Sequence, residues 1–157
     1  MIGNITNPQD SNKSKEIIGA GEVKDITKDA KTNDLKGKII VLMDNFRSDK
    51  GEAKVALFNS KDGFPDNPKK AYKAIISKIE NEKSEAIFTD IPFGVYAVGV
   101  LHDENSNGKM DTGWFGIPIE GFGASNDAKG FMGPPEFDKA KIKLISDSLS
   151  IKIKVNY

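Results

Sequence analysis

From residue 37 onward, hydrophobic and polar residues alternate in short runs that are typical of β-strands. The clearest run lies at the C-terminus, where Leu149, Ile151, Ile153, Val155 and Tyr157 alternate with Ser150, Lys152, Lys154 and Asn156. A period of two places the two sets on opposite faces of a strand. We therefore predict a strand whose apolar face meets a core and whose lysines face solvent, as in antiparallel sheets packed from one side.

Other segments follow the same logic. Residues 139–144 alternate Ala140, Ile142 and Leu144 with lysines, and β-rich runs lie at 38–43, 52–58, 85–89 and 95–101. A turn at Asp49-Lys50-Gly51 separates the first two of these runs, which predicts a hairpin with a longer loop. Residues 69–78 place Ala71, Ile75 and Ile76 at roughly helical spacing, so we expect one or two helical turns there.

The order of these segments predicts the fold class. Six or seven short strands without the spacing of βαβ units favour an all-β fold, an antiparallel β-sandwich of about seven strands with at most one short helix. Residues 35–157 are predicted to form this domain. Residues 1–34 are polar and carry few apolar side chains, so we expect a flexible leader. The alternative is that residues 17–26 form a short element docked on the domain.

Composition excludes several classes of protein. The 157 residues include 23 basic and 23 acidic side chains, and this balance argues against a nucleic-acid partner. The absence of cysteine excludes disulfides and thiolate chemistry. No run approaches the roughly 18 apolar residues of a membrane span. The polar residues after Met1 also lack the pattern of a signal peptide.

The segment from His102 to Gly123 carries the strongest chemical signal. Side chains with hard oxygen donors occupy alternate positions around a turn at Gly108, as in calcium-binding loops. In an EF-hand-type count Trp114 replaces the bidentate glutamate of position twelve, so Glu120 or water would complete the shell. The predicted Ca²⁺ ligands are Asp103, Asn105, Asn107, the carbonyl of Lys109, Asp111 and Glu120. The alternative is that these residues only form Asx-turns in a tight connection between strands.

His102 is the sole histidine and adjoins this loop. It could serve as a general base in a small metal-assisted hydrolase centred on His102, Asp103, Asp111 and Glu120. A lone histidine at a strand end more often packs or bonds to a nearby carbonyl, and we therefore expect the protein not to be an enzyme.

The long segment 113–135 is rich in glycine and aromatic residues. Its aromatic side chains are those of Trp114, Phe115, Phe122 and Phe131. Exposed, they would suit a sugar or peptide groove. We favour the other interpretation, that they anchor an irregular loop onto the sandwich, because loops of this length need packing of their own.

Two resemblances sharpen the fold prediction. The pattern Phe-x-Asp-Ile-Pro-x-Gly-x-Tyr from Phe88 to Tyr96 resembles prealbumin-like modules of carboxypeptidase regulatory domains and surface-protein stalks. The resemblance implies a prealbumin- or immunoglobulin-like sandwich. It also implies that Pro92 and Gly94 form a turn between two strands and that Tyr96 anchors the corner.

The wider match is to one bacterial family. The motifs His-Asp-x-Asn-x-Asn-Gly-x-x-Asp and Gly-x-Pro-x-Glu-Gly-x-Gly, with the neighbouring stretches 88–98 and 133–140, resemble domain-of-unknown-function family 2141 from about residue 35 to the C-terminus. Membership implies a small extracytoplasmic (periplasmic or secreted) β domain, usually made with a secretion signal. The family supplies no catalytic residues.

Together these observations predict a non-catalytic extracytoplasmic β-sandwich module. We expect a calcium ion to stabilise its 103–111 loop, and we expect it to bind a protein or carbohydrate partner. The metal-assisted hydrolase is the alternative.

Overall fold

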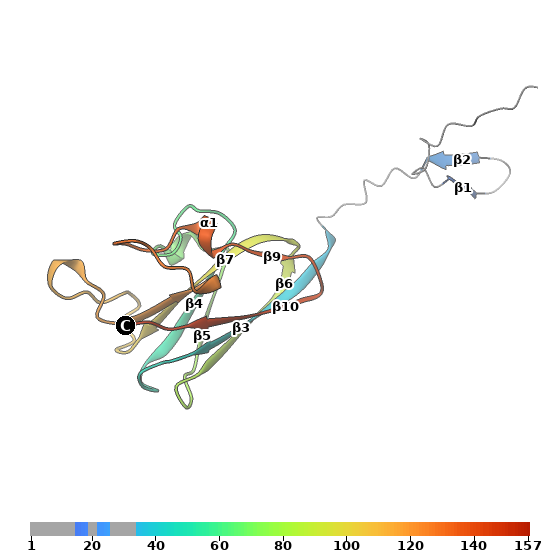
Figure 1. Cartoon of the computed structure of the whole chain (residues 1–157). Coiled ribbons are helices and arrows are strands. Elements are labelled where there is room, and N and C mark those ends of the chain that lie inside the picture. The colour runs from blue at the N-terminus through green and yellow to red at the C-terminus, as the bar shows by residue number, and fades with distance from the viewer. Residues whose placement is uncertain (1–14, 19–21, 26–33) are drawn as a thin grey trace, which may run out of the picture. The chain divides into compact units, whose positions relative to one another are not determined.

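The computed structural model describes residues 15–18, 22–25 and 34–157. Its contacts divide the chain into two units, residues 1–32 and 33–157. In the first unit, β1 (Lys15–Ile18) and β2 (Glu22–Asp25) pair antiparallel. Most of the expected flexible leader lies outside the described residues, as do residues 19–21 and 26 of the alternative docked element. The second unit carries the remaining elements, which are labelled in Figure 1.

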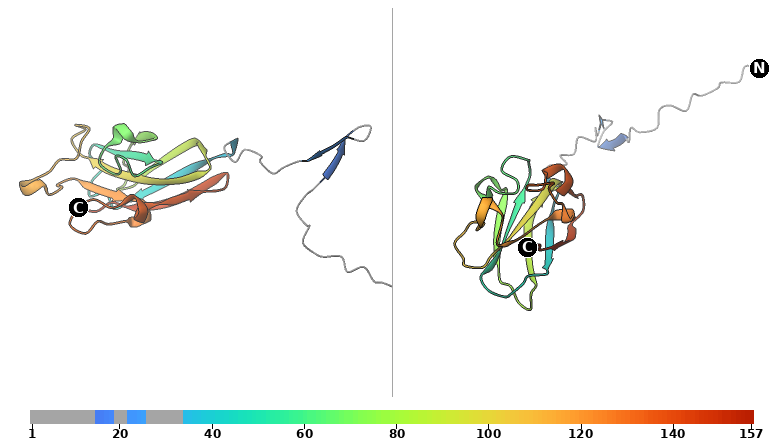
Figure 2. Two further views of the ribbon diagram at one scale, coloured as in Figure 1. Left: turned by 90° about the horizontal axis from the view of Figure 1, so that it is seen from above. Right: turned by 60° about the vertical axis from the view of Figure 1, so that its left-hand side comes forward.

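Two sheets form a sandwich in residues 34–157 (Figure 2). One sheet has the order β10-β3-β6, and the other has the order β5-β4-β7-β8 with β9 also pairing with β7. The strands are β3 (Lys36–Asp44), β4 (Glu52–Phe58), β5 (Lys73–Ser77), β6 (Ser84–Pro92), β7 (Gly94–Asp103), β8 (Gly121–Ala124), β9 (Ile142–Leu144) and β10 (Ser148–Lys154). The predicted all-β sandwich is therefore confirmed, with eight strands.

Helical structure in the described part is short. It comprises the 3-10 turns η2 (Pro68–Lys70), η3 (Trp114–Gly116) and η4 (Ser125–Asp127) and the single α-helix α1 (Phe137–Ala140). No helix among the described residues is long and apolar enough to cross a membrane. Of the one or two helical turns expected at 69–78, only the 3-10 turn η2 at the start is present, and the rest is wrong, because β5 occupies 73–77 and pairs with β4. The adjacent β-branched Ile75 and Ile76 suit a strand, in which the first packs on the core and the second faces solvent.

One pairing departs from the expected antiparallel pattern. β10 runs parallel to β3, with Ile151 opposite Val41. Two tight turns account for this direction, because each reverses the chain while moving it from one sheet to the other. β6 turns into β7 at Phe93, and β9 turns into β10 at 145–147, so β3, β7 and β10 all run the same way.

The predicted hairpin between residues 38–43 and 52–58 is also wrong, because β3 and β4 belong to different sheets. The chain crosses between the sheets at Asn45, which adopts a left-handed φ of 66° and donates from Nδ2 to the Val155 carbonyl at 2.7 Å. Phe46 follows and is buried with 1% exposure. Burial of this ring favours the crossing over a simple reversal.

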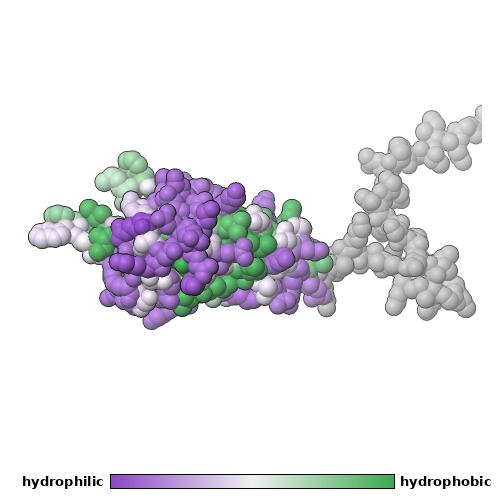
Figure 3. All heavy atoms as spheres, turned by 90° about the horizontal axis from the view of Figure 1, so that it is seen from below, coloured by the Kyte–Doolittle hydropathy of each residue, from purple (hydrophilic) through white to green (hydrophobic). Residues whose placement is uncertain are grey.

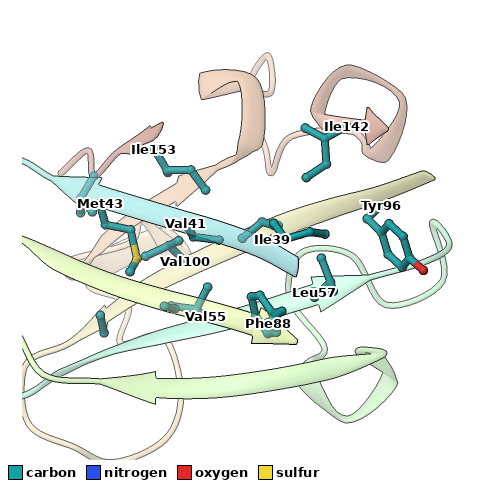
Figure 4. Packing of buried hydrophobic residues seen from close by; sticks show 14 of the residues in the cluster. Ile39, Val41, Met43, Val55, Leu57, Phe88, Tyr96, Val100, Ile142 and Ile153 are labelled. Atoms are coloured by element: carbon teal, nitrogen blue, oxygen red, sulfur yellow. The ribbon is translucent and has the colours of Figure 1, made fainter. Parts of the chain in front are cut away.

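Large apolar side chains from both sheets meet in the core, where Figure 4 shows them pointing toward one another. The labelled members include Ile39, Val41, Met43, Val55, Leu57, Phe88, Val100, Ile142 and Ile153. On β10 and beyond it, Ile153 and Val155 are buried while Leu149 and Ile151 are partly buried. The inward face predicted from the alternation is thus confirmed.

A second, smaller cluster covers the outer face of β7. Ala97 packs there with Ala124 and Ala140, and Phe64 and Phe137 close over them. Phe64 makes edge-to-face contacts with Phe58 and Phe137, with ring centroids 5.4 and 5.8 Å apart. β7 is therefore buried on both faces, which fixes the strand that leads into the candidate site. In the predicted strand at 139–144, residues up to Ala140 belong to α1, so only 142–144 are extended.

The corner between β6 and β7 has the predicted form. β6 ends at Pro92, β7 begins at Gly94, and the Tyr96 hydroxyl donates to the Pro92 carbonyl at 2.8 Å. Burial of Tyr96 raises the pKa of its hydroxyl, which keeps it protonated as the donor. The anchoring role implied for Tyr96 is confirmed.

Candidate functional site: the loop after β7

Asp103 ends β7 and organises the loop that follows. Its side chain is fully buried. Oδ1 accepts from the Asn107 amide at 3.0 Å, and Oδ2 accepts from the Gly108 amide at 2.7 Å. Gly108 has a φ of 87°, which lets the chain fold back over the carboxylate. The Lys54 ammonium, from the neighbouring β4, lies 3.2 Å from Oδ2.

Asp103 and Lys54 each stabilise the charged form of the other. Burial alone would raise the pKa of Asp103, but the bonds from Gly108, Lys54 and Asn107 outweigh it and lower that pKa below its ordinary value. Burial likewise opposes ionisation of Lys54, yet its bonds to Asp103 and Glu52 raise the pKa of the ammonium. Both groups are therefore charged at neutral pH, and the Lys54 ammonium places a positive charge beside the Asp103 carboxylate.

The exposed Asn105 and Asn107 and the half-buried Asp111 form the outer half of the cluster. The side-chain amide of Asn105 donates to Asp111 Oδ2 at 2.6 Å, and that of Asn107 donates to Asp111 Oδ1 at 2.8 Å. The Asn107 backbone amide is shared between Asp103 Oδ1 and Asn105 Oδ1, at 3.0 and 3.1 Å. The four side chains thus converge on one turn, and Asn105 and Asn107 make the Asx-type bonds of the alternative interpretation.

Glu120 and Lys109 lie at the edge of this cluster. The Glu120 side chain is 4% exposed and accepts from the Glu104 amide through Oε1 and from the Asp111 amide through Oε2, both at 2.9 Å. One carboxylate therefore ties the two ends of the loop together. Lys109 is exposed and donates its backbone amide to Asn107 Oδ1 at 2.9 Å. In the described part of the chain, no three carboxylate or imidazole groups are arranged as metal ligands, so a cation here would depend on the asparagine oxygens.

His102 is wholly buried behind the loop, and both of its ring nitrogens are engaged. Nε2 lies 2.8 Å from the Lys50 carbonyl, and Nδ1 lies 2.7 Å from the Tyr157 hydroxyl. Because a carbonyl only accepts, Nε2 carries a proton and donates it to Lys50. Tyr157 Oη in turn accepts from the Arg47 amide at 2.9 Å. A Cβ on Gly121 would lie 2.5 Å from the Tyr157 ring, so glycine leaves room for this contact.

Arg47 connects this buried group with the loop. Its Nε lies 2.6 Å from Glu104 Oε1, and its Nη2 donates to the Ile119 carbonyl at 3.1 Å. Its guanidinium also stacks 4.7 Å from the centroid of the Tyr157 ring. These contacts tie the crossing after β3, the C-terminal strand and the 103–120 loop together.

Sequence reasoning missed three of the residues that hold the loop: Lys54, Arg47 and Tyr157. Lys54 occupies a polar position of an alternating strand, and no local motif marks it as a partner of Asp103. Tyr157 ends an alternating run that predicts an inward side chain, yet it is 48% exposed and uses its hydroxyl on a residue 55 positions away. Only the sheet order could have revealed these contacts.

The aromatic residues of 113–135 do not behave as anchors. Trp114, Phe115 and Phe131 are 87%, 97% and 93% exposed, and only Phe122, on β8, is partly buried. The anchor interpretation is therefore wrong for those three residues. Trp114 and Phe115 lie in the loop between β7 and β8, which the polar contacts of Asp103 and Glu120 hold without them. Phe131 lies in the separate connection between η4 and α1.

The fold and this loop define a small β-sandwich domain with one elaborated connection. Residues 41–152 match a family described as an uncharacterized protein conserved in bacteria, DUF2141. The chain belongs to this family, which confirms the resemblance predicted from its motifs. No curated protein and no solved structure gives a significant match. The family description assigns no activity, so function has to be argued from the geometry.

Proposed function

We propose that this domain is a non-catalytic, extracytoplasmic binding module whose 103–111 loop is stabilised by a calcium ion. The observation that carries the calcium proposal is the convergence of Asp103, Asn105, Asn107 and Asp111 on one turn. Carboxylate and amide oxygens are the donors that calcium prefers. The extracytoplasmic location is an implication of family resemblance, and it is part of the proposal.

The donor set fits a cation of modest affinity. Half-turn rotation of the Asn105 and Asn107 side-chain amides exchanges nitrogen for oxygen, which would place carbonyl oxygens beside the Asp111 carboxylate. Those rotations give up the present hydrogen bonds, and Lys54 competes for Asp103. With only two carboxylates in the turn, we expect a dissociation constant of about 10⁻⁴–10⁻³ M, as in extracellular modules.

The contacts of His102 support a non-catalytic role. A hydrolase centred on His102, Asp103, Asp111 and Glu120 would need an imidazole that reaches a substrate. His102 is instead fully buried with both nitrogens bonded, and Glu120 is occupied by two backbone amides. These bonds suit residues that hold a loop in place.

Calorimetric unfolding in millimolar calcium and in chelator tests the proposal. At calcium about tenfold above the dissociation constant, we expect a gain of about 1.4 kcal/mol and a raised midpoint. Asp111→Ala is expected to abolish the gain, whereas Asp62→Ala, which removes an exposed carboxylate paired with Lys70, is expected to retain it. Lys54→Met is expected to enlarge the gain, because it removes the competing ammonium from Asp103.

The same measurements can reject the metal. Equal midpoints with calcium and chelator, in both the wild type and Lys54→Met, would leave the loop as a set of Asx-turns. Loss of the calcium increment in Asp62→Ala would indicate a site elsewhere on the domain.

A further inference from the structure

Two segments of the 103–135 region share an unusual sequence. Gly113–Pro118 and Gly130–Pro135 each begin with a glycine, continue with two large apolar residues and a second glycine, and end with a proline. The apolar pairs are Trp114-Phe115 and Phe131-Met132. Neither six-residue segment contains a charged residue. We call these segments tip 1 and tip 2.

Both tips present their apolar pairs to solvent. Trp114 and Phe115 are 87% and 97% exposed, and Phe131 and Met132 are each 93% exposed. In each pair the second residue has a left-handed backbone, with φ of 60° at Phe115 and 57° at Met132. Left-handed backbone is unfavourable for a bulky residue, and neither side chain recovers that cost by packing.

The tips stand clear of the sandwich but have closed bases. A Cβ built on the second glycine of either tip, Gly116 or Gly133, meets nothing within 4 Å. At the base of tip 1, the Gly113 amide donates to the Ile117 carbonyl at 2.8 Å. In tip 2, a Cβ on Gly130 would lie 2.1 Å from the Gly133 carbonyl oxygen, so the chain closes tightly there. The apolar pairs are thus presented on short, supported projections.

The two tips project from the same part of the domain. Figures 1 and 2 show the orange segments that contain them at the end of the sandwich where the C-terminus lies. Figure 3 shows hydrophobic residues on projections at that end; on this face the body is mostly hydrophilic and carries one hydrophobic strip. Charged residues of both signs border the tips. Lys109 and Asp111 precede tip 1, Lys129 precedes tip 2, and the exposed Glu136 follows tip 2.

We propose that tips 1 and 2 insert together into the interface of a phospholipid bilayer and anchor the domain on a membrane surface. This inference names the partner of the proposed binding module and rests on that proposal, but it does not require calcium. Aromatic side chains favour the headgroup region of a bilayer, and the absence of charge in both tips removes the main cost of insertion.

The shape of the tips favours lipid over a second copy of the chain. A stable dimer needs a continuous, complementary patch of about 800 Å² on each partner. Two narrow projections offer separated side chains, each of roughly 150–250 Å² for an aromatic residue, and a rigid partner would need two matching pockets. A fluid interface surrounds such projections on all sides without requiring complementarity.

Trp114 makes the test direct, because it is the sole tryptophan of the chain. The full chain is mixed with phosphatidylcholine vesicles, with and without phosphatidylglycerol, in calcium and in chelator. We expect co-flotation with the vesicles, a blue shift of Trp114 emission, and quenching by brominated lipid. Because insertion is hydrophobic, binding is expected to persist in 0.5 M salt, a level that screens surface charge.

Variants separate the tips from the rest of the surface. Phe131→Ser/Met132→Ser is expected to weaken binding at least about tenfold while leaving Trp114 in place as the reporter. Trp114→Ser/Phe115→Ser is expected to cost a similar factor, measured by flotation. The matched control is Ile76→Ser/Ile145→Ser, which removes two exposed aliphatic side chains from β5 and from the turn before β10 and is expected to bind like the wild type.

Three results would overturn the proposal. The first is that neither flotation nor an emission shift is seen with either vesicle composition. The second is that binding is undiminished when all four tip residues are serine. The third is that 0.5 M salt abolishes binding. Self-association that the tip variants abolish, without vesicle binding, would assign the tips to a dimer contact instead. Vesicle binding that is equal in calcium and chelator, together with a failed calcium titration, would reject the metal and keep the anchor.

Discussion

At its first residues β7 leaves a corner closed by apolar packing and one hydroxyl, whereas at its last residue it enters a loop held by buried carboxylates. The corner has the bond from Tyr96 to the Pro92 carbonyl and one from the Phe93 amide to the Leu35 carbonyl, above a dense core. The loop uses Asp103 and Glu120, both almost completely buried and each accepting two backbone amides. Apolar packing therefore holds the first residues of β7, and buried carboxylates hold the loop after its last residue.

This difference separates what stabilises the molecule from what it can contact. Near the corner Phe88, Ile91 and Tyr96 are buried, so their effect is on folding. Beyond Asp103 the polar bonds hold the backbone, and the large apolar side chains of the tips remain in solvent. A loop that is supported by carboxylates can expose aromatic residues without depending on them for its shape.

The largest effect that we expect comes from the core. Phe88→Ala removes a ring that is 1% exposed, and we expect the free energy of unfolding to fall by about 3–5 kcal/mol. Phe131→Ala removes an exposed phenyl ring from tip 2. We expect this substitution to change the free energy of unfolding by less than about 0.5 kcal/mol. Denaturant unfolding measures both. If both substitutions lowered the free energy of unfolding by similar amounts, the contrast between the core near the corner and the exposed tips would be contradicted.

An intermediate effect is expected at Glu120. Glu120→Gln replaces one acceptor oxygen with an NH₂ group, which would face a backbone amide of Glu104 or Asp111. We expect a loss of about 1–3 kcal/mol, typical of a buried donor left without a partner. Glu136→Gln, at an exposed position, serves as the matched control in the same unfolding experiment. If the two variants were equally stable, the carboxylate would not be what holds the loop.

The smallest change in the free energy of unfolding is expected when the pH is lowered. The pKa of Asp103 is lowered in the folded state, so its stabilising contribution is complete above the ordinary aspartate pKa of about 3.9 and is lost as pH falls through the lower folded value. Asp103→Asn is expected to be less stable than the wild type at pH 7, with a difference that narrows below about pH 4. Unfolding free energies between pH 7 and pH 3 measure this. A constant difference across that range would show that the charge of Asp103 contributes nothing.

Local chemistry in the sequence was enough to predict several features. The alternation along 149–155 predicted the inward face of β10, and Pro92, Gly94 and Tyr96 predicted the corner. Both could be predicted because a strand face and a tight turn depend on residues that are neighbours in sequence. The spacing of Asp103, Asn105, Asn107 and Asp111 likewise predicted that these side chains converge on one turn. The family motifs predicted the membership that the match over 41–152 confirms.

Features that depend on distant residues were decided by the tertiary structure. β3 and β4 lie in different sheets, because burying Phe46 between the sheets stabilises the fold more than a simple hairpin would. Residues 73–77 became a strand, because the edge of β4 was available for pairing. Lys54 reaches Asp103 only once β4 pairs with β7. Tyr157 reaches His102 only once the residues after β10 pair with β8 at Phe122, next to β7. Exposure of the two tips depends in the same way on where the body of the sandwich ends, which no local pattern of residues specifies.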